Sequence, residues 1–128
     1  MPALITRVPS EPRPAGLVVA VISLALALAG CSGGHTDRHT VTAALVNGKA
    51  GFEPATITVH TGDKVDLRVR NTTDRPHGFD IDGYGLEAQV IQPNAEPVRV
   101  RFTARRAGTF RIFCQLHPSH QTATLVVE

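Results

Sequence analysis

The stretch that decides the fold lies near the end of the chain, where residues 110–120 read Phe-Arg-Ile-Phe-Cys-Gln-Leu-His-Pro-Ser-His. Its first part alternates along the chain, which predicts a strand with Phe110, Ile112 and Cys114 on one buried face. Two imidazoles, His117 and His120, follow the thiol at intervals of three residues. A thiolate with imidazoles suits copper or zinc better than magnesium or calcium. The stretch therefore predicts a metal site at the end of a buried strand.

A third imidazole, His77, lies upstream in the segment Arg-Pro-His-Gly-Phe of residues 75–79. One early His with a late Cys-x-x-His at a strand end is typical of a mononuclear copper centre with two His ligands and one Cys. Such a centre usually adds one weak axial ligand. Because Cys114 and His117 are too close in sequence to enclose a metal alone, the fold has to hold His77 at a fixed distance from them.

Short alternating segments separated by turn residues make up most of the chain after residue 40. In residues 64–70, for example, Val65, Leu67 and Val69 are predicted to face inward and the charged residues outward. Residues 86–97 are predicted to be irregular. About seven to eight such strands, without helical periodicity, predict an all-β fold of the two-sheet Greek-key β-sandwich type.

These motifs resemble those of the cupredoxins, in particular the small plastocyanin- or amicyanin-like type. The matching segments are residues 51–59 with 62–63, 76–79, 108–110 and 113–120. The resemblance implies a cupredoxin-like domain over residues 41–128 that binds one mononuclear type 1-like copper ion.

The resemblance also implies a ligand set. His77, Cys114 and His117 correspond to the three equatorial copper ligands of the family. The axial Met of the family falls on His120 at the amicyanin-like spacing. We therefore expect His120 to be the fourth ligand, with an exposed loop residue as the alternative. An imidazole is a stronger donor to Cu(II) than a thioether, so ligation by His120 predicts a lower reduction potential than that of a Met-bearing relative.

The beginning of the chain has the features of a targeting signal. The apolar run of residues 16–29 is shorter than the ~20 residues of a membrane span and fits the apolar region of a secretory signal. It ends in Leu-Ala-Gly-Cys, which resembles a bacterial lipobox with cleavage before Cys31. We expect residues 1–30 to be a lipoprotein signal peptide and residues 31–40 a flexible tether. A lipid on Cys31 would anchor the domain to the outer face of the cytoplasmic membrane; the alternative is an ordinary signal peptide with an incidental Cys.

The charge balance and the number of cysteines limit the classes of function that the chain can have. The 13 basic and 11 acidic residues of the chain become eleven and ten once residues 1–30 are removed. This balance predicts no basic patch of the kind that binds nucleic acid, and no nucleic-acid partner is expected. With Cys31 lipidated, Cys114 is a lone thiol in an oxidising compartment, where metal ligation explains it best.

Three functions follow from this reading. The first is one-electron transfer with a protein redox partner that the sequence does not identify. The alternative is an extracytoplasmic protein that binds, buffers or delivers copper, and a metal-free structural sandwich is the third. A binuclear copper site would need two cysteines in the ligand loop, which holds one. Because a closed site of this type has no open coordination position and no paired acid and base, we expect no enzymatic activity.

Overall fold

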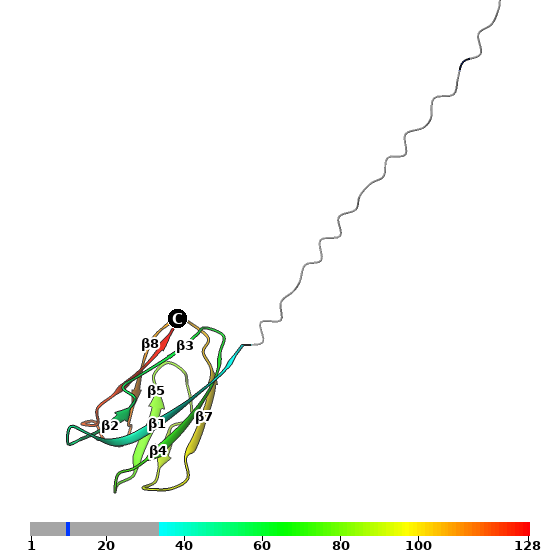
Figure 1. Ribbon diagram of the computed structural model, residues 1–128. Helices are drawn as coiled ribbons and strands as arrows, with labels where there is room; N and C mark the ends of the chain where they lie inside the picture. The colour runs from blue at the N-terminus through cyan, green and yellow to red at the C-terminus, as the bar shows by residue number, and fades with distance from the viewer. Residues whose placement is uncertain (1–9, 11–33) are drawn as a thin grey trace, which may run out of the picture. The chain divides into compact units, whose positions relative to one another are not determined.

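The computed structural model describes Ser10 and residues 34–128, so the predicted signal peptide and Cys31 lie outside the described residues (Figure 1). Residues Ser32–Glu128 form a compact unit of their own. Within the described part of the chain, no helix is long and apolar enough to span a membrane. The described residues form nine strands: β1 (Thr36–Val46), β2 (Lys49–Glu53), β3 (Thr56–Val59), β4 (Lys64–Asn71), β5 (His77–Ile81), β6 (Gln89–Ile91), β7 (Val98–Thr103), β8 (Gly108–Phe113) and β9 (Ala123–Val127).

The strands form two sheets, one in the order β2-β1-β4-β7 and the other in the order β3-β9-β8-β5-β6. The pairs β1–β4 and β3–β9 are parallel, whereas the other neighbours are antiparallel. The all-β, two-sheet prediction is confirmed, with nine strands in place of seven to eight. One added strand, β6, lies in the segment expected to be irregular. It has three residues, too few for an alternating pattern to reveal it.

The core lies between the two sheets. Most strands bury one of their two sides in it, whereas consecutive residues of β5 are buried. Val65, Leu67 and Val69 are buried, as their alternation predicts, and Phe110 and Ile112 are buried on the facing sheet. The removal of these aliphatic and aromatic side chains from water is the main force that holds the sheets together. The buried apolar residues are Val41, Ala43, Phe52, Ile57, Val59, Val65, Leu67, Val69, Phe79, Ile81, Ile91, Val100, Ala104, Phe110, Ile112, Cys114, Ala123, Leu125 and Val127.

The domain begins earlier than the sequence predicted, because β1 starts at Thr36 and not after residue 40. The segment expected to be the end of a flexible tether pairs in parallel with β4, from Thr36 beside Lys64 to Thr40 beside Arg68. The polar sequence of this segment gave no sign of a strand. Backbone hydrogen bonds to β4, and not the burial of an apolar face, hold the segment in place.

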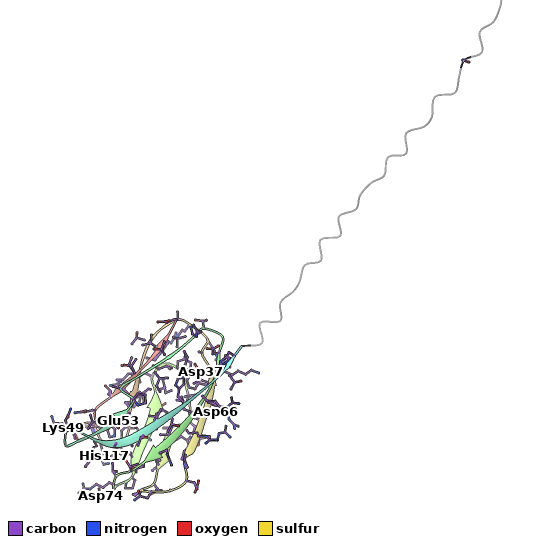
Figure 2. The ribbon with its side chains drawn as sticks, viewed as in Figure 1. Asp37, Lys49, Glu53, Asp66, Asp74 and His117 are labelled. Atoms are coloured by element: carbon purple, nitrogen blue, oxygen red, sulfur yellow. The ribbon has the colours of Figure 1, made fainter. Side chains whose placement is uncertain are left out.

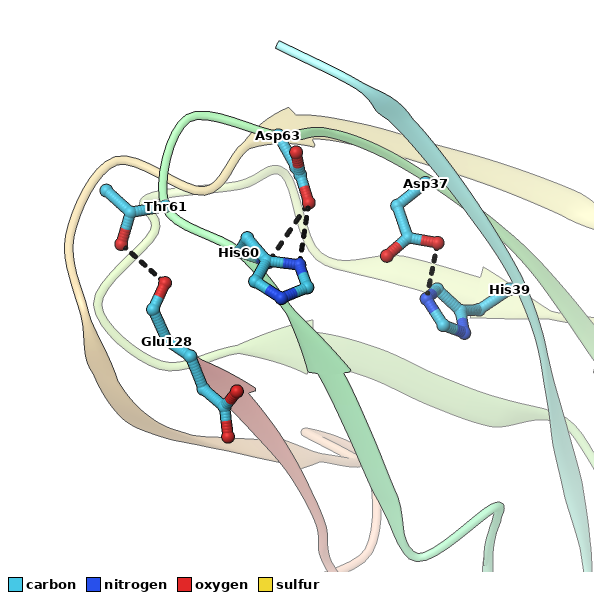
Figure 3. Close-up of polar contacts among 6 residues, drawn as sticks. All are labelled: Asp37, His39, His60, Thr61, Asp63 and Glu128. Atoms are coloured by element: carbon cyan, nitrogen blue, oxygen red, sulfur yellow. Dashed lines mark hydrogen bonds and ion pairs between the residues drawn. The ribbon is translucent and has the colours of Figure 1, made fainter.

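Polar contacts fasten the end of the sandwich at which β1 begins (Figure 3). The Asp63 carboxylate accepts a hydrogen bond from the backbone N–H of His60 at 3.0 Å. His39 Nε2 lies 3.0 Å from the Asp37 carboxylate, and the Thr61 hydroxyl donates to the backbone carbonyl of Glu128 at 3.0 Å. This end is separated from His117, which lies toward the other end of the sandwich (Figure 2).

Candidate metal centre

The register of the five-stranded sheet brings the early His and the late Cys together. His77 is the first residue of β5, and Cys114 directly follows the last residue of β8. The two strands are antiparallel neighbours, with Asp80 paired to Phe113. The start of one strand therefore lies beside the end of the other, at the edge of the core.

Three of the four predicted ligands form a buried group. The side-chain ligand atoms of His77, Cys114 and His120 all lie within 4.8 Å of one another, and each residue is at most 6% exposed. His120 is turned inward by a loop in which its backbone N–H donates to the carbonyl of His117 at 3.0 Å. His120, which replaces the axial Met of the family, thus lies inside the site and not in solvent.

The fourth predicted ligand, His117, lies at the rim. It is exposed, and its ring centroid is 5.9 Å from that of His77. With His77 and His120 it lines a cavity of about 380 Å³ that Lys49 and Arg75 also border. The structure therefore places His117 on the solvent side of the group, outside the set of mutually close ligand atoms.

Two imidazole nitrogens in this group are buried without a hydrogen-bond partner, namely His77 Nδ1 and His120 Nε2. The opposite nitrogen of each ring is engaged: His77 Nε2 lies 2.8 Å from Thr73 Oγ1, and His120 Nδ1 lies 2.9 Å from the carbonyl of Gln121. The carbonyl only accepts, so Nδ1 of His120 carries the hydrogen and Nε2 has a free lone pair.

Thr73 favours the matching tautomer of His77. Its hydroxyl hydrogen has oxygen acceptors in Asn71 Oδ1 at 2.8 Å and the carbonyl of Arg75 at 3.1 Å, which leaves the hydroxyl oxygen free to accept from His77 Nε2–H. With this tautomer, both rings carry a free lone pair on a buried nitrogen. An unpaired buried polar atom costs about 1–3 kcal/mol, which a bound metal ion would offset, so these residues fit a metal.

The surroundings keep both imidazoles in the neutral form that binds metals. Burial lowers the pKa of His77, and the neighbouring His120 and His117 lower it further, against a weaker opposing effect of Asp74. Burial also lowers the pKa of His120; the Gln121 carbonyl acts in the opposite direction, and His117 adds to the lowering. No proton has to be driven off these rings before a cation binds near pH 7.

The Cys114 sulfur is held by a backbone group. The N–H of Gly78 donates to Sγ at 3.1 Å, which fixes the position of the sulfur. A Cβ at residue 78 would collide with the carboxamide of Gln115, whose Nε2 donates to the carbonyl of Gln89 at 2.9 Å. The glycine after His77 thus makes room for a side chain from the opposite loop. Sequence reasoning missed this hydrogen bond because a backbone donor has no side-chain signal.

The loop before His77 is built around one buried amide. The side chain of Asn71 donates to the carbonyls of Arg75 at 2.7 Å and Ile91 at 2.9 Å, and its Oδ1 accepts from the backbone N–H of Thr73 at 2.9 Å. These hydrogen bonds hold the loop in one conformation. The contact between Thr73 and His77 then orients the imidazole ring. An Asn followed by polar residues in a turn is a signal that could have identified this network.

Comparison with known families agrees with this geometry. The family model for the cupredoxin-like domain matches residues 18–127. The chain belongs to this family. The buried His, Cys and His group of this cupredoxin fits a single type 1 copper ion.

Solved structures with the same fold differ widely in size. A copper nitrite reductase from Nitrosomonas europaea is 21% identical, with a TM-score of 0.62 over 73% of this chain and 41% of that chain. A heme-copper terminal oxidase is 19% identical, with a TM-score of 0.57 over 72% and 65%. A purple cupredoxin from Nitrosopumilus maritimus is 14% identical, with a TM-score of 0.51 over 70% and 98%. This cupredoxin thus spans less than two thirds of the first two chains, and the likeness shows the fold alone. No curated protein matches the chain.

Proposed function

We propose that this cupredoxin is a one-electron carrier with a copper ion held by His77, Cys114, His120 and the rim residue His117. The observation that carries the proposal is the pair of buried, unpartnered lone pairs beside the Cys114 thiol. When bound, copper would supply a reversible one-electron couple. We infer no enzymatic activity, because the cavity at the site is lined by cationic, neutral and imidazole side chains without a carboxylate to pair as an acid or base.

The protein itself would hold the buried ligands in place and leave one imidazole, that of His117, exposed to solvent. Thr73 and Gln121 fix the two buried rings, and the Gly78 N–H fixes the sulfur. Because these groups are held before the metal binds, little has to move when the charge at the site changes. His117 is the exposed imidazole of the group and offers a route for an electron to a partner protein at the surface.

We further propose that a lipid on Cys31 anchors the domain to the outer face of a bacterial cytoplasmic membrane. The support is the Leu-Ala-Gly-Cys ending of the apolar leader and the lone thiol of the domain, which lies buried at the site and makes no disulfide with a described residue. The redox partner would be another protein of the same compartment.

The second candidate is copper buffering or delivery. It is favoured by the open cavity beside the site and by the exposed position of His117, which would let copper be passed on. Electrochemistry of the copper-loaded protein separates the two. Electron transfer predicts a reversible one-electron wave and retention of copper against an apo-protein competitor. An irreversible wave with rapid loss of copper to the competitor would contradict it and favour delivery.

A further inference from the structure

The outward face of the four-stranded sheet gathers basic side chains from three neighbouring strands. The register places Asp66 of β4 between Arg38 of β1 and Arg101 of β7. It also places Arg68 of β4 beside Arg99 of β7. All of these residues except Asp66 are exposed. We call this surface the basic face; its cations are Arg38, Lys64, Arg68, Arg70, Arg99 and Arg101.

The domain has nearly equal numbers of basic and acidic residues, which conceals the concentration of basic residues on this face. Residues 34–128 hold eleven basic and ten acidic residues. Six of the basic residues and one acidic residue, Asp66, occupy the outward positions of β1, β4 and β7. The rest of the domain then holds five basic and nine acidic residues, of which one, Asp63, is buried. The domain is therefore strongly polarised, although its net charge is close to zero.

The carboxylate within the basic face, that of Asp66, is already satisfied, and a second one, Glu96, borders the face beside Arg68, Arg70 and Arg99. Arg99 contacts both oxygens of Asp66, and Arg101 Nε lies 3.6 Å from Oδ2. The other four cations, Arg38, Lys64, Arg68 and Arg70, make no ion pair with a described residue. A cavity of about 470 Å³ is lined by Arg38 and Lys64 together with the paired Arg99 and Arg101. The face thus presents unpaired positive charge to whatever lies beside it.

We propose that the basic face rests on the anionic phospholipid headgroups of the membrane that holds Cys31. The choice of a membrane as occupant rests on the proposed lipid anchor. Five residue steps separate Cys31 from Thr36, so chain length keeps the lipid-bearing residue within about 18 Å of the start of β1. Thr36 pairs with Lys64, a member of the basic face. The anchor is therefore tied to one end of the face.

The membrane explains the position of the face better than an acidic redox partner does. Attraction between basic residues and anionic lipid grows with the number of residues and falls off within a Debye length, about 8 Å at physiological salt. The link keeps one end of the face within about 18 Å of the lipid-bearing residue, so the face can reach the headgroups and bind them at that range. His117 lies toward the other end of the sandwich (Figure 2), where a partner protein can reach it while the sheet stays on the membrane.

The test uses the compact unit Ser32–Glu128, which lacks the anchor, and sedimentation with vesicles. We expect binding to vesicles of equal phosphatidylglycerol and phosphatidylcholine at low salt, loss of binding at high salt, and none with phosphatidylcholine alone. The variant Arg68→Glu/Arg70→Glu should reduce binding at least tenfold. The control Arg105→Glu/Arg111→Glu makes the same charge change away from the basic face, on the β7–β8 turn and on β8, and should keep most of it.

Equal losses in the two variants would overturn the proposal, because net charge and not the face would then govern binding. Absence of vesicle binding, with the wild type retained on immobilised polyglutamate, would also overturn it and assign the face to an acidic protein. A copper titration of each variant reports folding and the metal site independently of lipid. Intact copper binding without vesicle binding would thus remove the membrane contact and leave the proposed electron carrier standing.

Discussion

The two loops that deliver the candidate ligands are built in opposite ways. The loop from Asn71 to His77 is fastened by hydrogen bonds within itself, and Asn71, Thr73 and His77 are all buried. The loop from Cys114 to His120 is buried only at its two ends, and residues 115–119 between them are exposed. We call the first the fixed loop and the second the open loop. The contrast indicates that the fixed loop sets the geometry of the site, while the open loop gives it access to a partner.

The largest effect is expected from Asn71→Ala in the fixed loop. Loss of the buried amide leaves the carbonyls of Arg75 and Ile91 and the N–H of Thr73 without their partner. We expect the free energy of unfolding to fall by about 3 kcal/mol, measured by urea denaturation of the apo protein. The exposed amide of Gln92 is the control, and Gln92→Ala should change it by less than about 0.5 kcal/mol. Equal effects would contradict the role of the fixed loop.

Gly78→Ala tests the point at which the two loops touch. The new methyl group would occupy the place of the Gln115 carboxamide, the far end of an exposed side chain that can move aside. We therefore expect a loss of about 1 kcal/mol, the low end of the range for overpacking, and a shifted thiolate-to-copper absorption band. The double variant Gly78→Ala/Gln115→Ala should recover most of the loss in thermal denaturation. Failure to recover would mean that the glycine is required for another reason.

Thr73→Ala removes the group that orients His77. We expect the copper affinity to fall about 10- to 100-fold, the usual result of removing a hydrogen-bond partner of a ligating His. Thr73→Ser keeps the hydroxyl and should bind copper as the wild type does. Ser119→Ala, in the exposed part of the open loop, is the matching change on the other side of the site and should leave the affinity within about twofold. A competition titration with a copper chelator measures all three.

The smallest effect expected is a pH dependence of the apo protein. The pKa values of His77 and His120 are lowered in the folded state, whereas an unfolded chain has a His pKa of ~6.5. Below that pH the unfolded state binds more protons, so stability is complete above pH ~6.5 and is lost as pH falls toward the lowered folded values. Urea midpoints from pH 8 to pH 5 measure this loss, and His77→Gln/His120→Gln should flatten it. An unchanged slope in the double variant would assign the loss to other groups.

The sequence was enough to predict the features that depend on the alternation of apolar and polar residues and on the chemistry of metal ligands. The inward positions of Val65, Leu67 and Val69 follow from a period of two, and the gathering of His77, Cys114 and His120 agrees with the predicted ligand set. The roles of these residues as ligands stay predictions, as does the role of His117.

The features that the sequence did not reveal depend on backbone groups or on the register between distant strands. The hydrogen bond from Gly78 to the sulfur has a backbone donor. The early start of β1 depends on pairing with β4 and not on an apolar pattern. The basic face depends on which outward positions of three strands become neighbours. Total charge averages over that arrangement, so the prediction of no basic patch that was drawn from it is wrong.

The most direct test of the central claim is a titration of residues 32–128 with Cu(II), followed by visible absorption and EPR, for the wild type, Cys114→Ser and His120→Met. We predict an intense thiolate-to-copper band that saturates at one equivalent and is lost in Cys114→Ser. In His120→Met the band and hyperfine splitting should shift and the reduction potential should rise. A wild type without the band would contradict the copper site, and a His120→Met protein with unchanged spectrum and potential would contradict ligation by His120.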